Sequence, residues 1–292
     1  MKKRIIALLA LLAALLAGCG GGGNGETTSA VPSDPSASET APASSTFHIY
    51  CFQAGKADAF LLWNGDGAVL IDTGESGFGK TILAKLKDLG IERLDYLILT
   101  HFDKDHVGGA KKLVSDLPIG TILQSNCPKE GADAYDKYAA AVQARGLAPI
   151  TVREAMTFTL GGVSYAVNPP ARESYDVDES NNSSLIVTVT HGTNRLLFAG
   201  DAGDLRLTEY LRTDPGRFAL VKLPHHGVWQ NSLRELLAQI APAWAVITSS
   251  DEEPEAPETL ALLAERGVQT FLTRTVPVLI TSDGKTLTVE YE

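Results

Sequence analysis

The sequence has few cysteines and lacks a long apolar segment. Three cysteines occur among 292 residues, at positions 19, 51 and 127. Cys51 lies in the apolar run "FHIYCF", which favours a small core residue. A disulfide between Cys51 and Cys127 stays open, because sequence cannot establish the pairing. The apolar run over residues 5–17 has only thirteen residues, whereas a membrane-spanning helix needs about twenty.

Basic residues are scarce relative to acidic ones. Lys and Arg number 25 and Asp and Glu number 35, which gives a formal net charge of −10. Residues 1–18 hold three basic residues and no acidic one, so their removal would bring the charge to about −13. Tight binding of duplex DNA needs basic patches against the phosphates, so such a partner is disfavoured. A substrate that carries phosphate stays open, because bound metal ions would offset negative charge locally.

The N-terminus has the composition of an export signal. A basic start, "MKKR", precedes the apolar run, which leads into "LAGC". This pattern resembles a lipobox, in which Cys19 becomes the lipidated first residue of the mature chain. A simple anchor helix is the alternative, and the glycine tract directly after Cys19 argues against it.

The next segment predicts a linker. Residues 20–46 consist mostly of Gly, Ser, Thr, Pro and Ala without apolar periodicity, a composition that cannot bury enough surface to fold. We therefore expect a membrane-anchored lipoprotein outside the cytoplasm, whose lipid chains are sufficient for stable attachment. Its expected parts are a signal peptide over 1–18, a tether over 19–46 and a folded domain over 47–292.

Strand-like and helical segments alternate along the rest of the chain. Short β-type runs such as "GAVLID", "LDYLILT" and "NRLLFAG" stand between segments of helical periodicity. Groups of strands alternate with helices in both halves, and no repeat of short period occurs. This order predicts an α/β fold with two sheets packed face to face and helices outside, an αββα sandwich. The helical segments are 78–90, 105–117, 131–146, 204–213, 231–240 and 257–266.

Metal-capable side chains follow four of the strand-like runs. The densest group is "THFDKDHVGG" at residues 100–109, and "VLIDTG", "LLFAGDAG" and "ALVKLPHHGV" supply Asp72, Asp201 and the pair His225 and His226. One such group alone is compatible with a solvated turn. Loops at strand ends can converge in space, and binding sites concentrate there. The four groups together therefore predict a metal site.

The motifs "IDTG", "THFDKDHVGG", "FAGDA" and "LPHHG", in this order and spacing, resemble the metallo-β-lactamase superfamily over residues 47 to about 290. The resemblance is greatest to the metallo-β-lactamase-like domain of ComEC-type competence proteins. That subgroup reads H-x-D-x-D-H, with Asp103 at the position of a second histidine, and has an Asn-containing strand entry, here "NNSSLIV". The chain departs from it in "AGKADA", where a "GQGDA"-like turn is usual, and in Val228, where Ser is common.

The resemblance implies two divalent metal ions, and the residue chemistry agrees with it. Adjacent Asp105 and His106 point to different sides at a helix start, so they can serve one ion beside His101 and Asp103. The two oxygens of Asp201 can bridge two ions about 3.5–4 Å apart, which would hold a bridging hydroxide as the nucleophile. Carboxylate ligands shift the expected metal from zinc towards manganese. The predicted metal ligands are His101, Asp103, Asp105, His106, Asp201 and His225.

The second histidine of the pair and several polar residues are expected around the ions. We assign His225 to the metal and His226 to substrate or to proton transfer to the leaving group, although the residues alone leave open which is the ligand. Asp105 and His226 are the predicted catalytic residues. Asp72 is expected to orient the loop by hydrogen bonds rather than to bind metal. The residues expected near substrate or behind the ligands are Asp72, Asn182, Lys104 and His226.

The sequence is compatible with three functions. The two-metal ligand set favours a hydrolase of phosphodiesters, either small or polymeric. The loss of two superfamily histidines leaves open a non-catalytic surface protein that binds nucleic acid or another ligand. A phosphocholine esterase, or a hydrolase of lactones or β-lactams, is the third. The β-lactamases usually retain the H-x-H-x-D-H histidines, which disfavours that reading.

Overall fold

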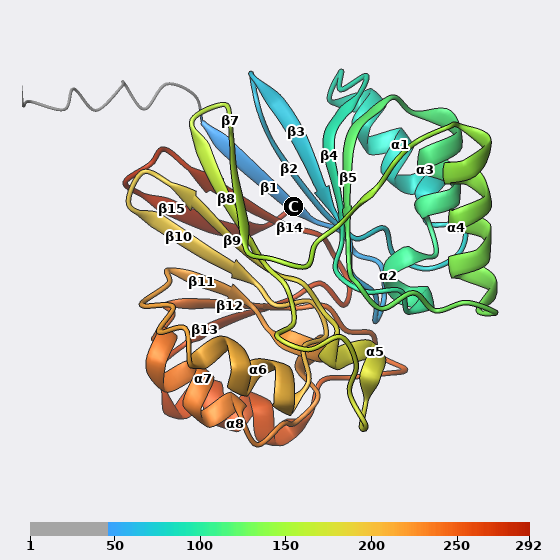
Figure 1. The fold of residues 1–292 in the computed structure, drawn as a ribbon. Coiled ribbons are helices and arrows are strands. Elements are labelled where there is room, and N and C mark those ends of the chain that lie inside the picture. Colours follow the sequence, from blue (N-terminus) through green and yellow to red (C-terminus); the bar gives the residue numbers. More distant parts are fainter. Residues whose placement is uncertain (1–45) are drawn as a thin grey trace, which may run out of the picture. The chain divides into compact units, whose positions relative to one another are not determined.

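The computed structural model describes residues 46–292 and contains two mixed β-sheets (Figure 1). The first sheet has the order β15-β14-β1-β2-β3-β4-β5-β6. Strands from β14 to β3 pair antiparallel and those from β3 to β6 pair parallel. Its strands are β1 (Phe47–Cys51), β2 (Phe60–Asn64), β3 (Gly67–Ile71), β4 (Leu94–Leu99), β5 (Ile119–Gln124), β6 (Ile150–Thr151), β14 (Val278–Ser282) and β15 (Leu287–Tyr291).

The second sheet has the order β13-β12-β11-β10-β9-β8-β7. Its strands from β7 to β10 pair antiparallel, and those from β10 to β13 pair parallel. Both sheets therefore contain a run of parallel strands whose carboxyl ends meet at one edge. The strands are β7 (Met156–Leu160), β8 (Val163–Asn168), β9 (Ile186–His191), β10 (Asn194–Phe198), β11 (Leu220–Lys222), β12 (Trp244–Ile247) and β13 (Gln269–Leu272).

Helices cover the outer face of each sheet. The first sheet carries α1 (Gly79–Asp88), α3 (Ala110–Asp116) and α4 (Asp133–Ala144), and the second carries α6 (Asp204–Leu211), α7 (Leu233–Ile240) and α8 (Pro257–Glu265) (Figure 1). Three short segments lie in connections. The helix α2 (Lys104–Val107) lies between β4 and α3, the helix α5 (Glu179–Asn182) between β8 and β9, and the turn Pro224–Gly227 between β11 and α7. The predicted αββα arrangement is confirmed.

Apolar side chains fill the space between the sheets and the space beneath the helices. The rings of Phe60 and Phe198, one from each sheet, pack edge to face with centroids 5.2 Å apart. In α7, Leu233, Leu237 and Ile240 recur at intervals of three and four residues, so they share one face, and all are buried. Each such burial stabilises the fold by about 1.5–3 kcal/mol. These contacts hold α7 against the outer face of the second sheet.

One helix predicted from the sequence is divided in the structure. The segment 105–117 forms α2 and α3, which are separated at Gly108 and Gly109. A Cβ atom on Gly109 would lie 2.3 Å from the carbonyl oxygen of Thr73, and one on Gly108 would lie 2.4 Å from the amide nitrogen of Ser76. The glycine pair lets the loop after β3 approach the backbone closely. That approach breaks the helix and fixes α2 as a separate turn.

The N-terminal predictions lie largely beyond the described residues. The expected signal peptide over 1–18 and all of the expected tether except Thr46 are outside them, while β1 begins at Phe47. Among residues 46–292, no helix combines the length and apolar character needed to cross a membrane.

Candidate metal centre

The polar side chains that the sequence singled out lie at the carboxyl ends of parallel strands. Asp72 follows β3, His101 follows β4, Asp201 follows β10, and His226 lies in the turn after β11. The loop between β1 and β2 adds Asp58, whose amide donates to the carbonyl of Asp105. Ligands commonly bind at such strand ends, because the loops that leave them converge.

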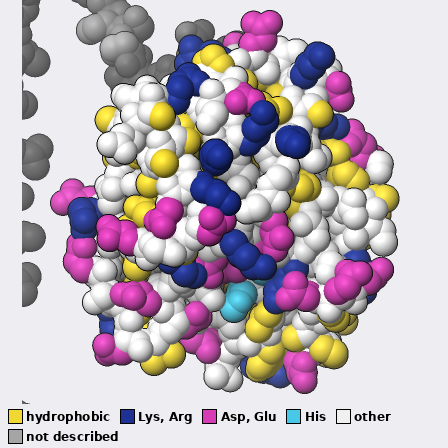
Figure 2. Space-filling view, turned by 90° about the vertical axis from the view of Figure 1, so that its right-hand side faces the viewer, with side chains coloured by type: hydrophobic (Ala, Val, Ile, Leu, Met, Phe, Trp, Pro, Cys, Tyr) yellow, Lys and Arg dark blue, Asp and Glu magenta, His cyan; other side chains and the backbone are white. Residues whose placement is uncertain are grey.

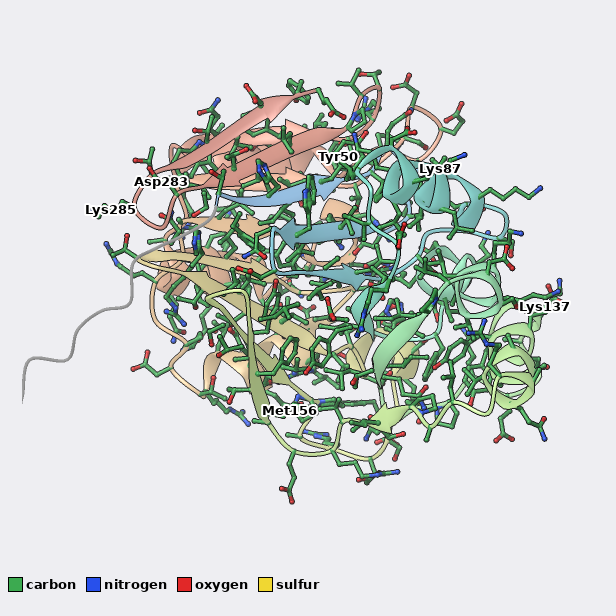
Figure 3. All side chains as sticks on the ribbon, turned by 90° about the horizontal axis from the view of Figure 1, so that it is seen from above. Tyr50, Lys87, Lys137, Met156, Asp283 and Lys285 are labelled. Carbon is green, nitrogen blue, oxygen red and sulfur yellow. The ribbon has the colours of Figure 1, made fainter. Side chains whose placement is uncertain are left out.

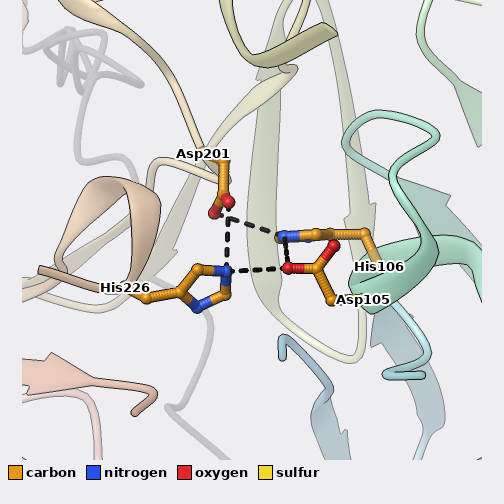
Figure 4. Close-up of side chains that lie close together, drawn as sticks. All are labelled: Asp105, His106, Asp201 and His226. Atoms are coloured by element: carbon orange, nitrogen blue, oxygen red, sulfur yellow. Dashed lines mark hydrogen bonds and ion pairs between the residues drawn. The ribbon is translucent and has the colours of Figure 1, made fainter. Parts of the chain in front are cut away.

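The side chains of Asp105, His106, Asp201 and His226 form one compact group (Figure 4). The Nε2 atom of His106 lies 3.2 Å from Asp201 Oδ1, and that of His226 lies 3.0 Å from Asp201 Oδ2 and 3.2 Å from Asp105 Oδ2. One potential ligand atom from each residue falls within 4.8 Å of all the others. Two imidazole nitrogens and two carboxylates at this spacing can surround a single divalent ion.

Unsatisfied polar atoms show that this group fits a cation. His106 Nε2 and Asp201 Oδ1 are both buried and have no hydrogen-bond partner. Burial disfavours protonation of His106, but Asp201 and Asp72 outweigh it and hold the pKa of His106 well above its usual value. Burial also opposes ionisation of Asp201, whereas the neighbouring His226 and His106 hold its pKa well below its usual value. The site therefore favours positive charge, which a divalent ion would supply.

Asp72 orients His106 from behind. Its Oδ2 atom lies 2.8 Å from His106 Nδ1, and its two oxygens accept hydrogen bonds from the amide and hydroxyl of Thr100. A proton on Nδ1, shared with Asp72, leaves the Nε2 lone pair directed at the group. Asp72 has a left-handed backbone, with φ of 56°, which marks a strained position at this loop. The structure places Asp72 against His106, and its orienting role stays a prediction.

Replacement of Asp72 by alanine is expected to weaken metal binding by about 10- to 100-fold, because His106 would lose its fixed ring orientation and tautomer. Calorimetric titration with Mn²⁺ measures the effect. Asp66→Ala is the control, since Asp66 is exposed in the turn between β2 and β3, and it should leave the affinity unchanged. Equal affinities in the Asp72 variant and the wild type would show that Asp72 serves only the loop.

The structure brings His226, rather than His225, into the group. His226 Nδ1 lies 2.9 Å from the Thr248 hydroxyl, which donates to Asp58 Oδ1, so the opposite nitrogen faces Asp105 and Asp201. Both histidines have a left-handed backbone, with φ of 49° and 52°. This conformation turns the two rings apart, with centroids 6.3 Å apart and planes at 68°. The sequence-based assignment of His225 to the metal and His226 to the substrate is therefore exchanged.

Lys222 is a central residue that sequence reasoning missed. It is fully buried at the end of β11, where its ammonium pairs with Asp58, lies 3.5 Å from Asp201 Oδ1 and donates to the carbonyl of Gly200. Asp58 and Asp201 are thereby held beside a fixed positive charge. A lysine inside the apolar run "FALVKL" was the signal that could have identified it, since buried lysines are rare unless paired.

His101 and Asp103 lie beside the group rather than in it. The His101 ring is buried 4.1 Å from that of His106, and burial, with the neighbouring His106, lowers the pKa of His101 to about 3. Its Nε2 atom is 3.9 Å from Asp103 Oδ2. The other oxygen of Asp103 accepts from the Lys129 ammonium at 2.6 Å and from the Ser180 hydroxyl. Of the six predicted ligands, the structure groups Asp105, His106 and Asp201.

Two further predicted residues have other partners. The Asn182 amide donates to the carbonyl of Val177, and its oxygen accepts from the backbone of Arg206. Asn182 thus supports the start of α6 behind Asp201. Lys104 pairs with Glu75 at 3.3 Å, and its side chain is 77% exposed. Lys104 nevertheless lines a pocket of about 490 Å³ together with Asp103, Asp105 and Lys129.

The face that carries α1 to α4 collects basic side chains. Figure 2 shows lysines and arginines running from the upper part of this face to its centre, with acidic side chains mostly below and around them. Cations are therefore available on this face.

The family model of the metallo-beta-lactamase superfamily matches residues 53–247, which is more than half of the chain. The chain belongs to this superfamily. The metallo-beta-lactamase fold protein YhfI from Bacillus subtilis has the same fold, with a TM-score of 0.51 at 14% identity over 82% of this chain and 100% of that one. The matched span includes the whole compact group, from Asp105 to His226.

Competence-type proteins are among the relatives of this superfamily member. ComE operon protein 3 of Bacillus subtilis is 28% identical over 201 residues, 63% of this chain and 25% of that protein. Recombination protein 2 of Haemophilus influenzae is 26% identical over 214 residues, 72% of this chain and 25% of that protein. The chain therefore spans about a quarter of the length of these curated relatives. They confirm the resemblance that the motifs indicated.

Proposed function

We propose that this superfamily member is a metal-dependent hydrolase that cleaves phosphodiesters outside the cytoplasm. The compact group of Asp105, His106, Asp201 and His226 is the observation that carries the proposal. A divalent ion bound there would act as a Lewis acid. It would ease the deprotonation of water and offset negative charge on phosphoryl oxygens. No serine or cysteine nucleophile is then required.

The residues around the group are placed to orient the ligand histidines, to transfer a proton to the leaving group and to accommodate the substrate. Asp72 and Thr248 fix the rings of His106 and His226, so both imidazoles are held ready before the substrate arrives. His225 stays outside the group and is partly exposed, so it is available to hold a proton for the leaving group. The pocket beside Asp103 and Asp105 offers room for the substrate.

An anionic substrate is supported by two observations. Lys104 and Lys129 line the pocket next to the group, and an ammonium is a common partner of phosphate oxygens. The relatives include proteins named for competence and recombination, which favours a nucleic-acid phosphodiester, small or polymeric. The overall charge of −10 still argues against tight binding of duplex DNA.

Two other functions make different predictions. A non-catalytic protein would bind a ligand or nucleic acid and turn over no ester at all. A phosphocholine esterase, or a hydrolase of lactones or β-lactams, would need the same metal but a different pocket. The lysines at the pocket suit an anionic substrate, which favours the phosphodiester over an uncharged lactone.

A three-substrate screen separates these functions. Protein lacking residues 1–46 is loaded with Mn²⁺ or Zn²⁺ and assayed on bis-p-nitrophenyl phosphate, p-nitrophenyl phosphocholine and nitrocefin. We expect turnover of the first compound and its loss with a chelator. Preferential turnover of phosphocholine or nitrocefin would assign one of the other hydrolases. Metal binding without any turnover would favour the ligand-binding protein.

We expect the metal-free protein to regain phosphodiesterase activity better with Mn²⁺ than with Zn²⁺. Carboxylates supply half of the compact group, and oxygen ligands suit manganese, whereas imidazole-rich sites suit zinc. Zinc can still bind more tightly by the general affinity order, so occupancy and activity are measured separately. Highest activity with zinc would contradict the argument from ligand hardness.

Cys19 is proposed as the lipidated first residue of the mature protein, because "LAGC" follows a basic and apolar leader. Cys19→Ala is expected to leave the chain unprocessed or to release it from the membrane fraction. Intact mass and detergent partitioning measure these effects, with Cys127→Ala as the control. An unchanged mass and unchanged partitioning in the Cys19 variant would contradict the proposal.

A further inference from the structure

Asp103 is engaged by a lysine at the position where the sequence pattern predicts a metal ligand. One oxygen of Asp103 accepts from Lys129 Nζ at 2.6 Å and from the Ser180 hydroxyl. The other oxygen lies 3.9 Å from His101 Nε2. Asp103 is outside the compact group that would hold one ion. The partners of Asp103 are therefore a cation from the loop before α4 and a hydroxyl donor from α5.

The Lys129 ammonium lies beside Asp103 Oδ1, where a metal ion bound by that oxygen would have to lie. Lys129 lies between β5 and α4, and the turn is closed by a hydrogen bond from the amide of Ala132 to the carbonyl of Lys129. Its side chain is 45% exposed, so it reaches Asp103 from the solvent side. A divalent ion bound by the same oxygen would meet this ammonium as a like charge at short range.

The charges around the centre fit a single divalent ion. Lys222 pairs with Asp58, and Lys129 pairs with Asp103. Asp72 and Asp105 have no lysine within ion-pair distance among the described residues, and Asp72 is bonded to His106 and Thr100. Asp201 lies 3.5 Å from the Lys222 ammonium, which Asp58 engages more closely. One doubly charged ion then balances Asp105 and Asp201, which are the two carboxylates in the compact group.

We propose that the Lys129 ammonium takes the place of a second metal ion, so that the chain holds one divalent ion tightly. This inference rests on the proposed metal-dependent function and departs from the two ions that the sequence pattern implied. Lys129 also lines the pocket beside Asp105. It would therefore present the second positive charge to an anionic oxygen of the substrate, opposite the ion.

The test counts ions. The purified chain is freed of metal and titrated with Mn²⁺ by calorimetry, and bound metal per chain is measured by elemental analysis after dialysis. We expect one tight site in the wild type. In Lys129→Ala a second Mn²⁺ should bind at least about tenfold more tightly than any second ion in the wild type, a change of about 1.4 kcal/mol. Lys129→Arg retains the positive charge and should keep the wild-type count.

Lys137 provides a matched control on the neighbouring helix. It projects outward from α4 (Figure 3), is 51% exposed and pairs with Asp133 at 2.6 Å. Lys137→Ala thus removes an ion pair of the same length from a similarly exposed lysine and should leave one tight site. Circular dichroism of each variant, compared with the wild type, shows whether the fold is intact.

The outcomes are distinguishable. Two equally tight Mn²⁺ ions in the wild type would overturn the inference and leave the proposed hydrolase standing. An unchanged count in folded Lys129→Ala would also overturn it. A wild type that binds no Mn²⁺ would overturn both the inference and the metal-dependent function. A second ion that appears in Lys129→Ala, but in neither Lys129→Arg nor Lys137→Ala, supports the inference.

Discussion

Replacement of Asp201 by alanine is expected to remove most of the bound metal and to lower phosphodiesterase activity by about a thousandfold or more. Asp201 contacts both His106 and His226, and one of its oxygens is buried without a hydrogen-bond partner. Its loss would leave two imidazoles and one partly exposed carboxylate to hold the ion. A contribution of several kcal/mol from the ion corresponds to this loss of rate.

Metal content by elemental analysis and the rate with bis-p-nitrophenyl phosphate measure the two effects of this substitution. Asp116→Ala is the control, because Asp116 is an exposed residue at the end of α3. Lys222 would lose one neighbouring carboxylate in the Asp201 variant but keep Asp58, so the fold should persist. Wild-type metal content in folded Asp201→Ala would show that Asp201 is a turn residue and not a ligand.

His226→Ala and His225→Ala are expected to have different effects on metal content and on the rate of hydrolysis. Loss of His226 should release the metal as loss of Asp201 does, because its Nε2 atom faces both Asp105 and Asp201. Loss of His225 should leave the metal bound and lower the rate by about 100-fold, the contribution expected of a positioned proton donor. Metal content and rate, measured side by side, separate a ligand from a group that only handles protons.

His48→Ala is the control for both histidine variants. His48 stacks on Trp63, with ring centroids 5.1 Å apart, in β1 and β2, so its replacement should change neither quantity. Retained metal in His226→Ala together with lost metal in His225→Ala would reverse the assignment made from the structure. It would restore the one made from the sequence.

The layers and most helices were predictable because local pattern and burial agree. The predicted helix over 231–240 is found as Leu233–Ile240, and that over 257–266 as Pro257–Glu265. In both, apolar residues at helical spacing face a sheet that needs covering. The segment 105–117 had the same periodicity but is divided at Gly108 and Gly109. The cause is the approach of the loop after β3, a contact between segments distant in sequence.

The superfamily and the kinds of residue at the centre were determined by the sequence. The order of Asp72, the residue 101–106 cluster, Asp201 and the histidine pair is a linear property, and each motif follows a strand-like run. Because parallel strands bring their carboxyl ends to one edge, convergence of these motifs could be inferred without coordinates. The position of Asp72 beside a histidine of the centre was also predictable, since a buried carboxylate behind such a histidine is a common arrangement.

The partner of each side chain was decided only by the tertiary structure. Adjacent histidines cannot be ranked from sequence, and the left-handed backbone at His225 and His226 is what turns His226 towards Asp105. Asp103 pairs with Lys129, 26 residues away, and Asp58 pairs with Lys222, from the other sheet. The residues of such pairs are distant in the chain and lie on different loops or sheets, and no local sequence pattern identifies them. Their distances depend on how the two sheets pack.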